Sequence, residues 1–133
     1  MMKGAHSART ALFVDDDPAI LDLLAEILTD AGFAPTCFAL GAPAEAALAQ
    51  QGFDLLLVDQ WLPDMNGLRL CEVARERYGN TPVVVMITAD ARRERKVTAL
   101  TLYVDDFVGK PFDNDVLLAR IEAIFRRRDQ AST

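Results

Sequence analysis

Residues 54–59 read Asp-Leu-Leu-Leu-Val-Asp, and this stretch decides the fold class of the chain. Its apolar part has the length of a strand but does not alternate with polar residues, so it predicts a strand buried on both faces, as in a parallel sheet. The valine-rich run at 82–87 has the same character. Two such runs, separated by a helical pattern, indicate a parallel α/β sheet.

The segments on either side of these runs complete five strand–helix units. The other strands are expected at 11–14, 34–38 and near 107–108, and the helices at 18–31, 43–51, 67–78, 91–102 and from 113 onward. Asp17 and Asp113 are expected to cap helices, with Pro18 at a first helical position. This alternation predicts helices on both faces of the sheet and right-handed crossovers.

Composition and charge exclude several classes of protein. A length of 133 residues suits one compact domain, and a formal net charge of -6 argues against general nucleic-acid or anionic-membrane binding. No apolar run approaches the ~20 residues of a membrane span, and the first ten residues lack the apolar segment of a secretory signal. Cys37 and Cys71 lie among apolar residues, which predicts buried free thiols in a cytoplasmic protein. The single histidine, His6, excludes a histidine metal cluster or catalytic triad.

Polar side chains interrupt the chain just after the predicted strands. In open parallel sheets the carboxyl ends of the strands form the edge where ligands bind. The residues expected at this edge are Asp15, Asp16, Asp59, Thr88 and Lys110. Each alone has an ordinary interpretation, as a solvated strand-end acid, a strand-end hydroxyl or a surface lysine. Their joint placement indicates a functional site.

The residue types at this edge favour phosphoryl chemistry with a divalent cation. Three converging carboxylates repel one another unless a cation or a lysine lies nearby, and Mg²⁺ prefers oxygen ligands. Asp59 is the candidate nucleophile, because an aspartate can form an acyl phosphate. Lys110 would neutralise the phosphoryl group, and Thr88 would donate its hydroxyl to a phosphoryl oxygen. The Lys110–Pro111 bond is a candidate cis peptide.

Four motifs, in this order, resemble those of the receiver domain family of two-component response regulators. They are Val14-Asp15-Asp16-Asp17-Pro18, Val58-Asp59-Gln60-Trp61-Leu62-Pro63-Asp64-Met65-Asn66-Gly67, Ile87-Thr88-Ala89 and Phe107-Val108-Gly109-Lys110-Pro111-Phe112. The resemblance covers residues 10–128, which leaves 1–9 as a flexible tail and 129–133 as a C-terminal tail or the start of a linker. It implies an α/β, flavodoxin-like, doubly wound sheet of five parallel strands in the order 2-1-3-4-5, with helices on both faces.

The same resemblance implies a role for each acid. Asp59 would take a phosphoryl group from the phosphohistidine of a sensor histidine kinase or a histidine phosphotransfer protein. Mg²⁺, or Mn²⁺, would be held by the side chains of Asp16 and Asp59 and by the backbone carbonyl of Trp61, with Asp15 acting mainly through water. The chain would be a signalling protein rather than an enzyme, catalysing only its own phosphoryl transfer and dephosphorylation.

The resemblance also implies a switch that a new local charge would operate. Thr88 would move toward the phosphoryl group while Phe107 rotates inward, and the face formed by the fourth helix, the fifth strand and the last helix would change. Phe107 has an equally simple interpretation as a core residue. Unlike a tyrosine, it cannot form a hydrogen bond through a phenol hydroxyl.

Three residues depart from what the resemblance leads us to expect. Tyr103 stands where receivers often have glycine, so we expect no left-handed helix cap there and an altered fourth helix. Trp61, two positions after Asp59, is expected to shield the phosphoryl group and slow its hydrolysis, a hypothesis that Trp61→Asn tests. Asp90 adds an acid near the site entrance.

Partners and other function classes remain open at this point. The last helix resembles that of the winged-helix transcription-factor class, which suggests a homodimer through the switching face, whereas the domain itself is expected to contact neither nucleic acid nor membrane. An aspartate-nucleophile phosphatase fits less well, because such enzymes usually place the nucleophile at the first strand within an Asp-x-Asp arrangement, whereas here the first strand is followed by adjacent aspartates and the lone acid follows the third strand. A nucleotide or flavin binder fits less well because the chain has no Gly-x-Gly-x-x-Gly loop. A docking module that works without phosphorylation is the remaining alternative. The sequence leaves the output domain, the cognate kinase and the phosphoryl lifetime unassigned.

Overall fold

The computed structural model describes residues 8–97 and 101–131, and they form a five-stranded parallel sheet. The strand order is β2-β1-β3-β4-β5. Their bounds are β1 (Arg9–Val14), β2 (Phe33–Phe38), β3 (Leu55–Asp59), β4 (Val83–Thr88) and β5 (Asp106–Gly109). The predicted fold class and strand order are therefore confirmed.

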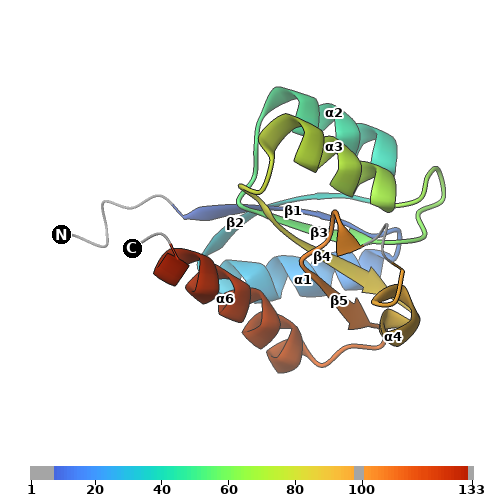
Figure 1. Cartoon of the computed structure of the whole chain (residues 1–133). Coiled ribbons are helices and arrows are strands. Elements are labelled where there is room, and N and C mark those ends of the chain that lie inside the picture. Colours follow the sequence, from blue (N-terminus) through green and yellow to red (C-terminus); the bar gives the residue numbers. More distant parts are fainter. Residues whose placement is uncertain (1–7, 98–100, 132–133) are drawn as a thin grey trace.

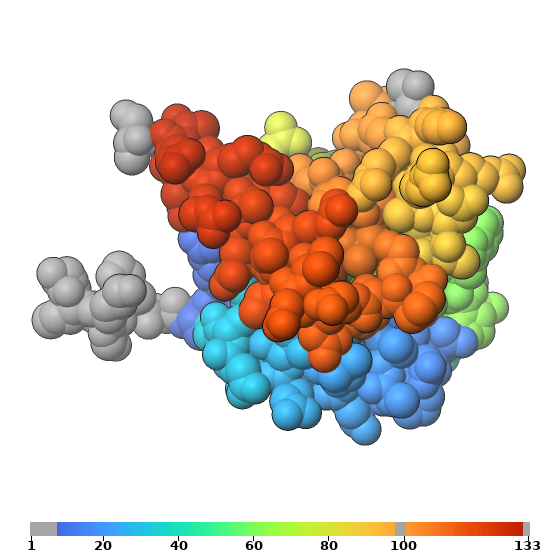
Figure 2. Space-filling view, turned by 90° about the horizontal axis from the view of Figure 1, so that it is seen from below, coloured from blue at the N-terminus to red at the C-terminus, as the bar shows by residue number. Residues whose placement is uncertain are grey.

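Helices cover both faces of this sheet (Figure 1). They are α1 (Pro18–Asp30), α2 (Gly41–Gln50), α3 (Leu68–Tyr78), α4 (Ala91–Glu94) and α6 (Asn114–Ala131). Helices α2 and α3 lie on one face, and α1 and α6 lie on the other; Figure 2 views the second face, where α1 and α6 pack side by side. No helix in the described part of the chain is long and apolar enough to cross a bilayer.

The central position of β3 in the sheet explains why its sequence does not alternate between apolar and polar residues. Leu56 and Val58 join the apolar cluster beneath α2 and α3, whereas Leu55 and Leu57 join the cluster beneath α1 and α6. All five residues of the strand are buried. Since both faces of β3 contact a hydrophobic layer, its first four positions favour apolar side chains, and only Asp59, at the carboxyl end, is polar.

The helix starts agree with the capping signals. Asp17 accepts a hydrogen bond from the Ala19 amide at 2.9 Å, with Pro18 at the first helical position, and Asp113 accepts from the Asp115 amide at 2.8 Å. Both cysteines are free thiols, but only Cys71 is buried. The prediction for Cys37 was wrong because β2 is an edge strand, where one side chain in two can face solvent.

The fourth helix is shorter than the predicted 91–102. Helix α4 ends at Glu94. The Arg95 amide still donates to the Ala91 carbonyl, but the Lys96 and Val97 amides donate to carbonyls three residues back, on Arg93 and Glu94, which interrupts the α-helix; the four-residue spacing returns where the Thr101 amide donates to the Val97 carbonyl. Residues 98–100 lie outside the described part. No described non-glycine residue has a positive φ, which confirms that Tyr103 forms no left-handed cap. The elements run from Arg9 to Ala131, and the domain limits at 10 and 128 stay predictions.

One arginine ties together the amino end of β4 and the loop before β5. Arg75 is 11% exposed and donates to the backbone carbonyls of Tyr103 (3.1 Å), Gly79 (3.2 Å) and Pro82 (2.8 Å). It also forms an ion pair of 2.9 Å with Asp105. A guanidinium offers five N–H donors in a fixed geometry, so no other side chain satisfies all four acceptors.

Replacing Arg75 with methionine is therefore expected to lower the free energy of unfolding by about 3 kcal/mol, because three carbonyls lose this donor and Asp105 keeps only its bonds from Arg128 and the Val84 amide. Urea unfolding followed by circular dichroism measures this change. Arg77→Met is the matched control, since Arg77 is exposed and donates to the Ala49 carbonyl. The control is expected to change stability by about 0.5 kcal/mol or less, and equal losses in both variants would contradict the assignment.

Candidate functional site

The carboxyl ends of the strands bring the predicted acids together. Asp15 and Asp16 follow β1, and Asp59 ends β3, the neighbouring strand in the sheet. One carboxylate oxygen from each of the three acids lies within 4.8 Å of the others. Asp15 is 0% exposed and Asp59 is 7% exposed, whereas Asp16 is exposed. The site therefore has two buried acids and one that reaches solvent.

Lys110 completes the charge pattern from the end of β5. Its Nζ lies 2.8 Å from Asp15 Oδ2 and 3.3 Å from Asp59 Oδ2. The Lys110–Pro111 peptide bond is cis, as the sequence suggested. Burial alone would lower the pKa of Lys110, but the hydrogen bond to Asp15 and the charges of Asp15 and Asp59 together raise it. The ammonium is therefore firmly protonated between the two acids.

The surroundings of the Asp59 carboxyl disfavour its ionised form. Burial, and then the charge of Asp15, raise its pKa above the ordinary value, while Lys110 and a backbone hydrogen bond from Trp61 act in the opposite direction. One ammonium thus does not fully compensate the acids. A site with an excess of negative charge and exposed carboxylate oxygens can accept a further cation.

The Asp15 carboxylate supports this interpretation. Its Oδ1 accepts a hydrogen bond from the Asp17 amide at 2.9 Å, which fixes the loop after β1. Its Oδ2 is buried, and its partner among the described residues is the ammonium of Lys110 at 2.8 Å, which Asp15 shares with Asp59. Three carboxylates that have one ammonium between them fit a hard divalent cation, with Asp15 near the cation or its bound water.

Mg²⁺ is accordingly expected to stabilise the folded chain. At 100 times its Kd, a ligand of the folded state adds about 2.7 kcal/mol to the free energy of unfolding, and urea unfolding with and without Mg²⁺ measures this.

Without Mg²⁺, Asp59→Asn is expected to be more stable than the wild type at neutral pH, since a raised carboxyl pKa means that the ionised form destabilises the fold.

The penalty from Asp59 is present above its pKa in the folded state and disappears as the pH falls below the carboxyl's ordinary value. The advantage of Asp59→Asn should therefore vanish in acid. Asp22→Asn, an exposed change on α1, is the matched control. A urea unfolding midpoint of the wild type that does not change in millimolar Mg²⁺ would contradict the metal site.

The hydroxyl of Thr88 has a partner that the sequence did not reveal. Thr88 ends β4 and is 2% exposed, and its Oγ1 donates to Gln60 Oε1 at 2.8 Å. Gln60 is 3% exposed and its Nε2 donates to Glu94 Oε2 at 3.3 Å. The one available signal was a polar residue directly after a fully buried strand. Phe107 is 3% exposed and packs in the cluster that contains Met86, so this aromatic side chain is already buried.

The two remaining residues near the entrance have distinct environments. Trp61 is 63% exposed, and with Thr88 and Gln60 it lines a hollow beside α4. Asp90 is the N-cap of α4 and accepts a hydrogen bond from the Arg93 amide at 3.1 Å. Capping therefore accounts for Asp90 without a role in the site.

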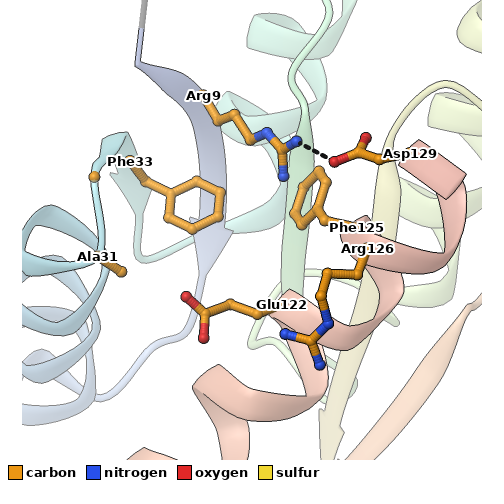
Figure 3. A pocket seen from close by; sticks show the side chains of 8 residues that line it. Arg9, Ala31, Phe33, Glu122, Phe125, Arg126 and Asp129 are labelled. Atoms are coloured by element: carbon orange, nitrogen blue, oxygen red, sulfur yellow. Dashed lines mark hydrogen bonds and ion pairs between the residues drawn. The ribbon is translucent and has the colours of Figure 1, made fainter. Parts of the chain in front are cut away.

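Another cavity lies at the opposite end of the sheet (Figure 3). It has a volume of about 400 Å³ and is lined by residues including Arg9 at the start of β1, Phe33 at the start of β2 and Phe125 of α6. Arg9 lies over the Phe125 ring at 4.0 Å and pairs with Asp129 at 3.1 Å. Since none of the carboxyl-edge residues lines it, this cavity is separate from the acidic site.

Comparisons with known proteins agree with the fold. The family model for the response regulator receiver domain matches residues 11–122. The transcriptional regulatory protein GltR of Pseudomonas aeruginosa is 39% identical over 91% of this chain and 50% of its own length. RpaA of Synechocystis, described as a DNA-binding dual master transcriptional regulator, is 36% identical over 90% of this chain and 50% of its own length. The chain thus spans about half the length of these curated relatives.

A solved structure shows the same architecture over nearly the whole chain. The crystal structure of a CheY-like response regulator receiver domain protein from Methanospirillum hungatei superimposes with a TM-score of 0.84 and 31% identity, covering 94% of this chain and 99% of that one. The family match, the sheet order and the acidic strand ends point to the same conclusion. The chain belongs to the response regulator receiver domain family of two-component signalling.

Proposed function

We propose that Asp59 accepts a phosphoryl group from the phosphohistidine of a sensor histidine kinase or a histidine phosphotransfer protein. The observation that carries this proposal is the convergence of Asp59 with two other carboxylates and with Lys110, whose Nζ lies 3.3 Å from Asp59 Oδ2. Family membership supports a phosphorylation-based signalling role. In this proposal the chain catalyses only its own phosphorylation and dephosphorylation, and does so in the cytoplasm, where free thiols such as those of this chain persist.

Phosphoryl transfer requires of the protein mainly that it place the reacting groups and neutralise the charge on the phosphoryl oxygens. An Asp59 carboxylate oxygen attacks phosphorus in line, the bond between phosphorus and the donor imidazole breaks, and the imidazole nitrogen keeps the electron pair. Lys110 offsets negative charge on the phosphoryl oxygens. Thr88 donates to one of them once its hydroxyl leaves Gln60. Attack by water on phosphorus later releases inorganic phosphate and restores the carboxylate.

Mg²⁺ is part of this proposal, with Mn²⁺ as a substitute of similar ligand preference. The side chains of Asp16 and Asp59 and the backbone carbonyl of Trp61 would hold it, with Asp15 acting through water. The cation would neutralise charge on the phosphoryl oxygens during transfer. The convergence of three carboxylates with a single ammonium supports a cation at this position.

Intact-mass analysis after incubation with a small phosphoryl donor tests the assignment. One phosphoryl group per chain, dependent on Mg²⁺, is expected for the wild type and for the control Asp22→Asn, and none for Asp59→Asn. Labelling that survives in Asp59→Asn would place the acceptor elsewhere. No labelling of the wild type with any donor would favour the alternative, a docking module that works without phosphorylation.

Trp61 is proposed to slow the loss of the phosphoryl group. Its ring is 63% exposed and lines the hollow next to Thr88, so it stands where water would approach. Trp61→Asn is expected to lose the phosphoryl group several-fold faster, because a small polar side chain admits and orients water. The decay of phosphorylated chain by mass measures the rate. An unchanged or slower rate would show that the indole does not shield the site.

A homodimer through α4, β5 and α6 is proposed as the form that phosphorylation favours. Asp106 pairs within the chain with Arg95 at 3.2 Å and with Arg120 at 3.0 Å, so this face presents charges that a second copy could share. Exposed ion pairs are individually weak, which would allow such an exchange. Sedimentation of the phosphorylated chain tests it, and a monomer at all concentrations would contradict it. Contact with DNA is not assigned to this domain.

A further inference from the structure

The residue after the acceptor, Gln60, is the buried polar group that the proposed chemistry leaves unexplained. Its backbone is fixed on both sides, because its amide donates to the Ile87 carbonyl at 3.0 Å and its carbonyl accepts from the Gly67 amide at 2.6 Å. Its side chain is 3% exposed. A buried amide must find hydrogen-bond partners, and a hydrocarbon would fill this space at lower cost.

The partners of Gln60 assign the orientation of its amide. Glu94 Oε2 lies 3.3 Å from Nε2, and a carboxylate can only accept. The oxygen Oε1 therefore faces Thr88, whose Oγ1 donates to it at 2.8 Å. Gln60 thus connects the hydroxyl at the end of β4 to the last residue of α4.

A hydroxyl has one proton to donate. While the proton of Thr88 is donated to Gln60, it cannot be donated to a phosphoryl oxygen on Asp59. The two hydrogen bonds exclude each other, so formation of the second requires that the first be broken. Breaking it leaves Gln60 Oε1 without its donor in a buried place, which adds to the cost of switching.

We propose that Gln60 is a positioning residue that holds Thr88 in its unphosphorylated orientation and ties this orientation to α4 through Glu94. The inference rests on the proposed function, since it concerns the response to a phosphoryl group on Asp59. Gln60 sets the equilibrium between the two states of Thr88: its hydrogen bond stabilises the unphosphorylated state alone. When the bond breaks, the Gln60 amide and Glu94 are free to move together, and the change reaches the last residue of α4.

Beryllofluoride with Mg²⁺ is the probe, because it mimics a phosphoryl group on an aspartate without covalent transfer. Trp61 reports its binding, as it is the only tryptophan of the chain and lines the same hollow as Gln60 and Thr88. Gln60→Met keeps the length of the side chain but accepts no comparable hydrogen bond. We expect the full chain with Gln60→Met to bind beryllofluoride about tenfold more tightly, the effect of one buried hydrogen bond.

The Thr88→Val variant, used as a second background for Gln60→Met, distinguishes a positioning role of Gln60 from a packing role. In Thr88→Val there is no hydroxyl to release, so adding Gln60→Met is expected to leave the affinity for beryllofluoride unchanged. Glu94→Ala keeps the buried amide but removes its outer anchor, and we expect it to tighten binding about two- to threefold. Glu94 is partly exposed, so this variant reports on the connection even where Gln60→Met fails to fold.

The outcomes distinguish the inference from the function on which it rests. Wild type that shows no Mg²⁺-dependent binding of beryllofluoride overturns the proposed function, and the role of Gln60 falls with it. Wild type that binds, with equal or weaker binding by Gln60→Met and Glu94→Ala, overturns the role of Gln60 alone. A tenfold gain that persists in the Thr88→Val background also overturns it, since Gln60 would then act by packing.

Discussion

Replacing Gly67 with alanine is expected to lower the free energy of unfolding by about 3 kcal/mol, at the upper end of what overpacking costs, and to weaken Mg²⁺ binding as well. A Cβ on Gly67 would lie 2.3 Å from the backbone oxygen of Asp59 and 2.5 Å from Val58 Cγ1. The backbone of Gly67 is in the right-handed helical region, so alanine is not excluded by its torsion angles. The conflict is steric, and it involves the main chain of the proposed acceptor.

The main chain at the end of β3 cannot move without moving the site. The Gly67 amide donates to the Gln60 carbonyl at 2.6 Å, so an added methyl group would push Asp59 and Gln60 away together. Urea unfolding gives the loss of stability, and calorimetry gives the loss of Mg²⁺ affinity. Both should change, since one displacement causes both.

Gly109→Ala is the matched control, because Gly109 also lies at the carboxyl edge of the sheet. Its added Cβ would meet Ala91 Cβ at 3.8 Å and the Thr88 oxygen at 3.9 Å, which are ordinary contacts. We expect a change of about 0.5 kcal/mol or less. A Gly67→Ala variant as stable as this control, with wild-type Mg²⁺ affinity, would show that the loop after Asp59 adjusts without moving the acceptor.

The architecture was predictable because burial on two faces leaves a clear mark on the sequence. The runs Leu55–Val58 and Val83–Ile87 are apolar at every position, and this pattern has few explanations other than a central parallel strand. Parallel strands then direct their carboxyl ends to one edge. The positions of Asp15, Asp59 and Lys110 relative to one another followed from topology, without knowledge of any side-chain contact.

What the sequence did not predict depends on contacts between distant residues. Gln60 and Arg75 each bond to a partner 28 residues away in the sequence, Thr88 and Tyr103 respectively. The early end of α4 was missed because charged residues beyond Glu94 suit a helix as well as a turn. Local patterns carry no information about such partners, and only the folded chain supplies it.

Lys110→Met is expected to change two properties in opposite directions. The ammonium lies 2.8 Å from Asp15 Oδ2 and 3.3 Å from Asp59 Oδ2, so it shares these carboxylates with any bound cation. Without it, the acids lose their competing positive charge, and Mg²⁺ should bind about tenfold more tightly. Phosphoryl uptake, by contrast, should fall about 100-fold, since the charge that develops on the phosphoryl oxygens loses a fixed cationic partner.

Because Mg²⁺ affinity and phosphoryl uptake are expected to change in opposite directions, a damaged fold cannot explain both results. A misfolded site would weaken both Mg²⁺ binding and phosphoryl uptake, whereas the loss of one cation strengthens the first and weakens the second. Because Lys110 lowers the pKa of Asp59, its removal favours protonation of that carboxyl, so the calorimetric titrations belong at about pH 8, well above ordinary carboxyl values. Lys96→Met is the control, since it removes the same charge from an exposed position. Equal or weaker Mg²⁺ binding by Lys110→Met, beside an unchanged control, would mean that the ammonium organises the carboxylates for the metal rather than competing with it.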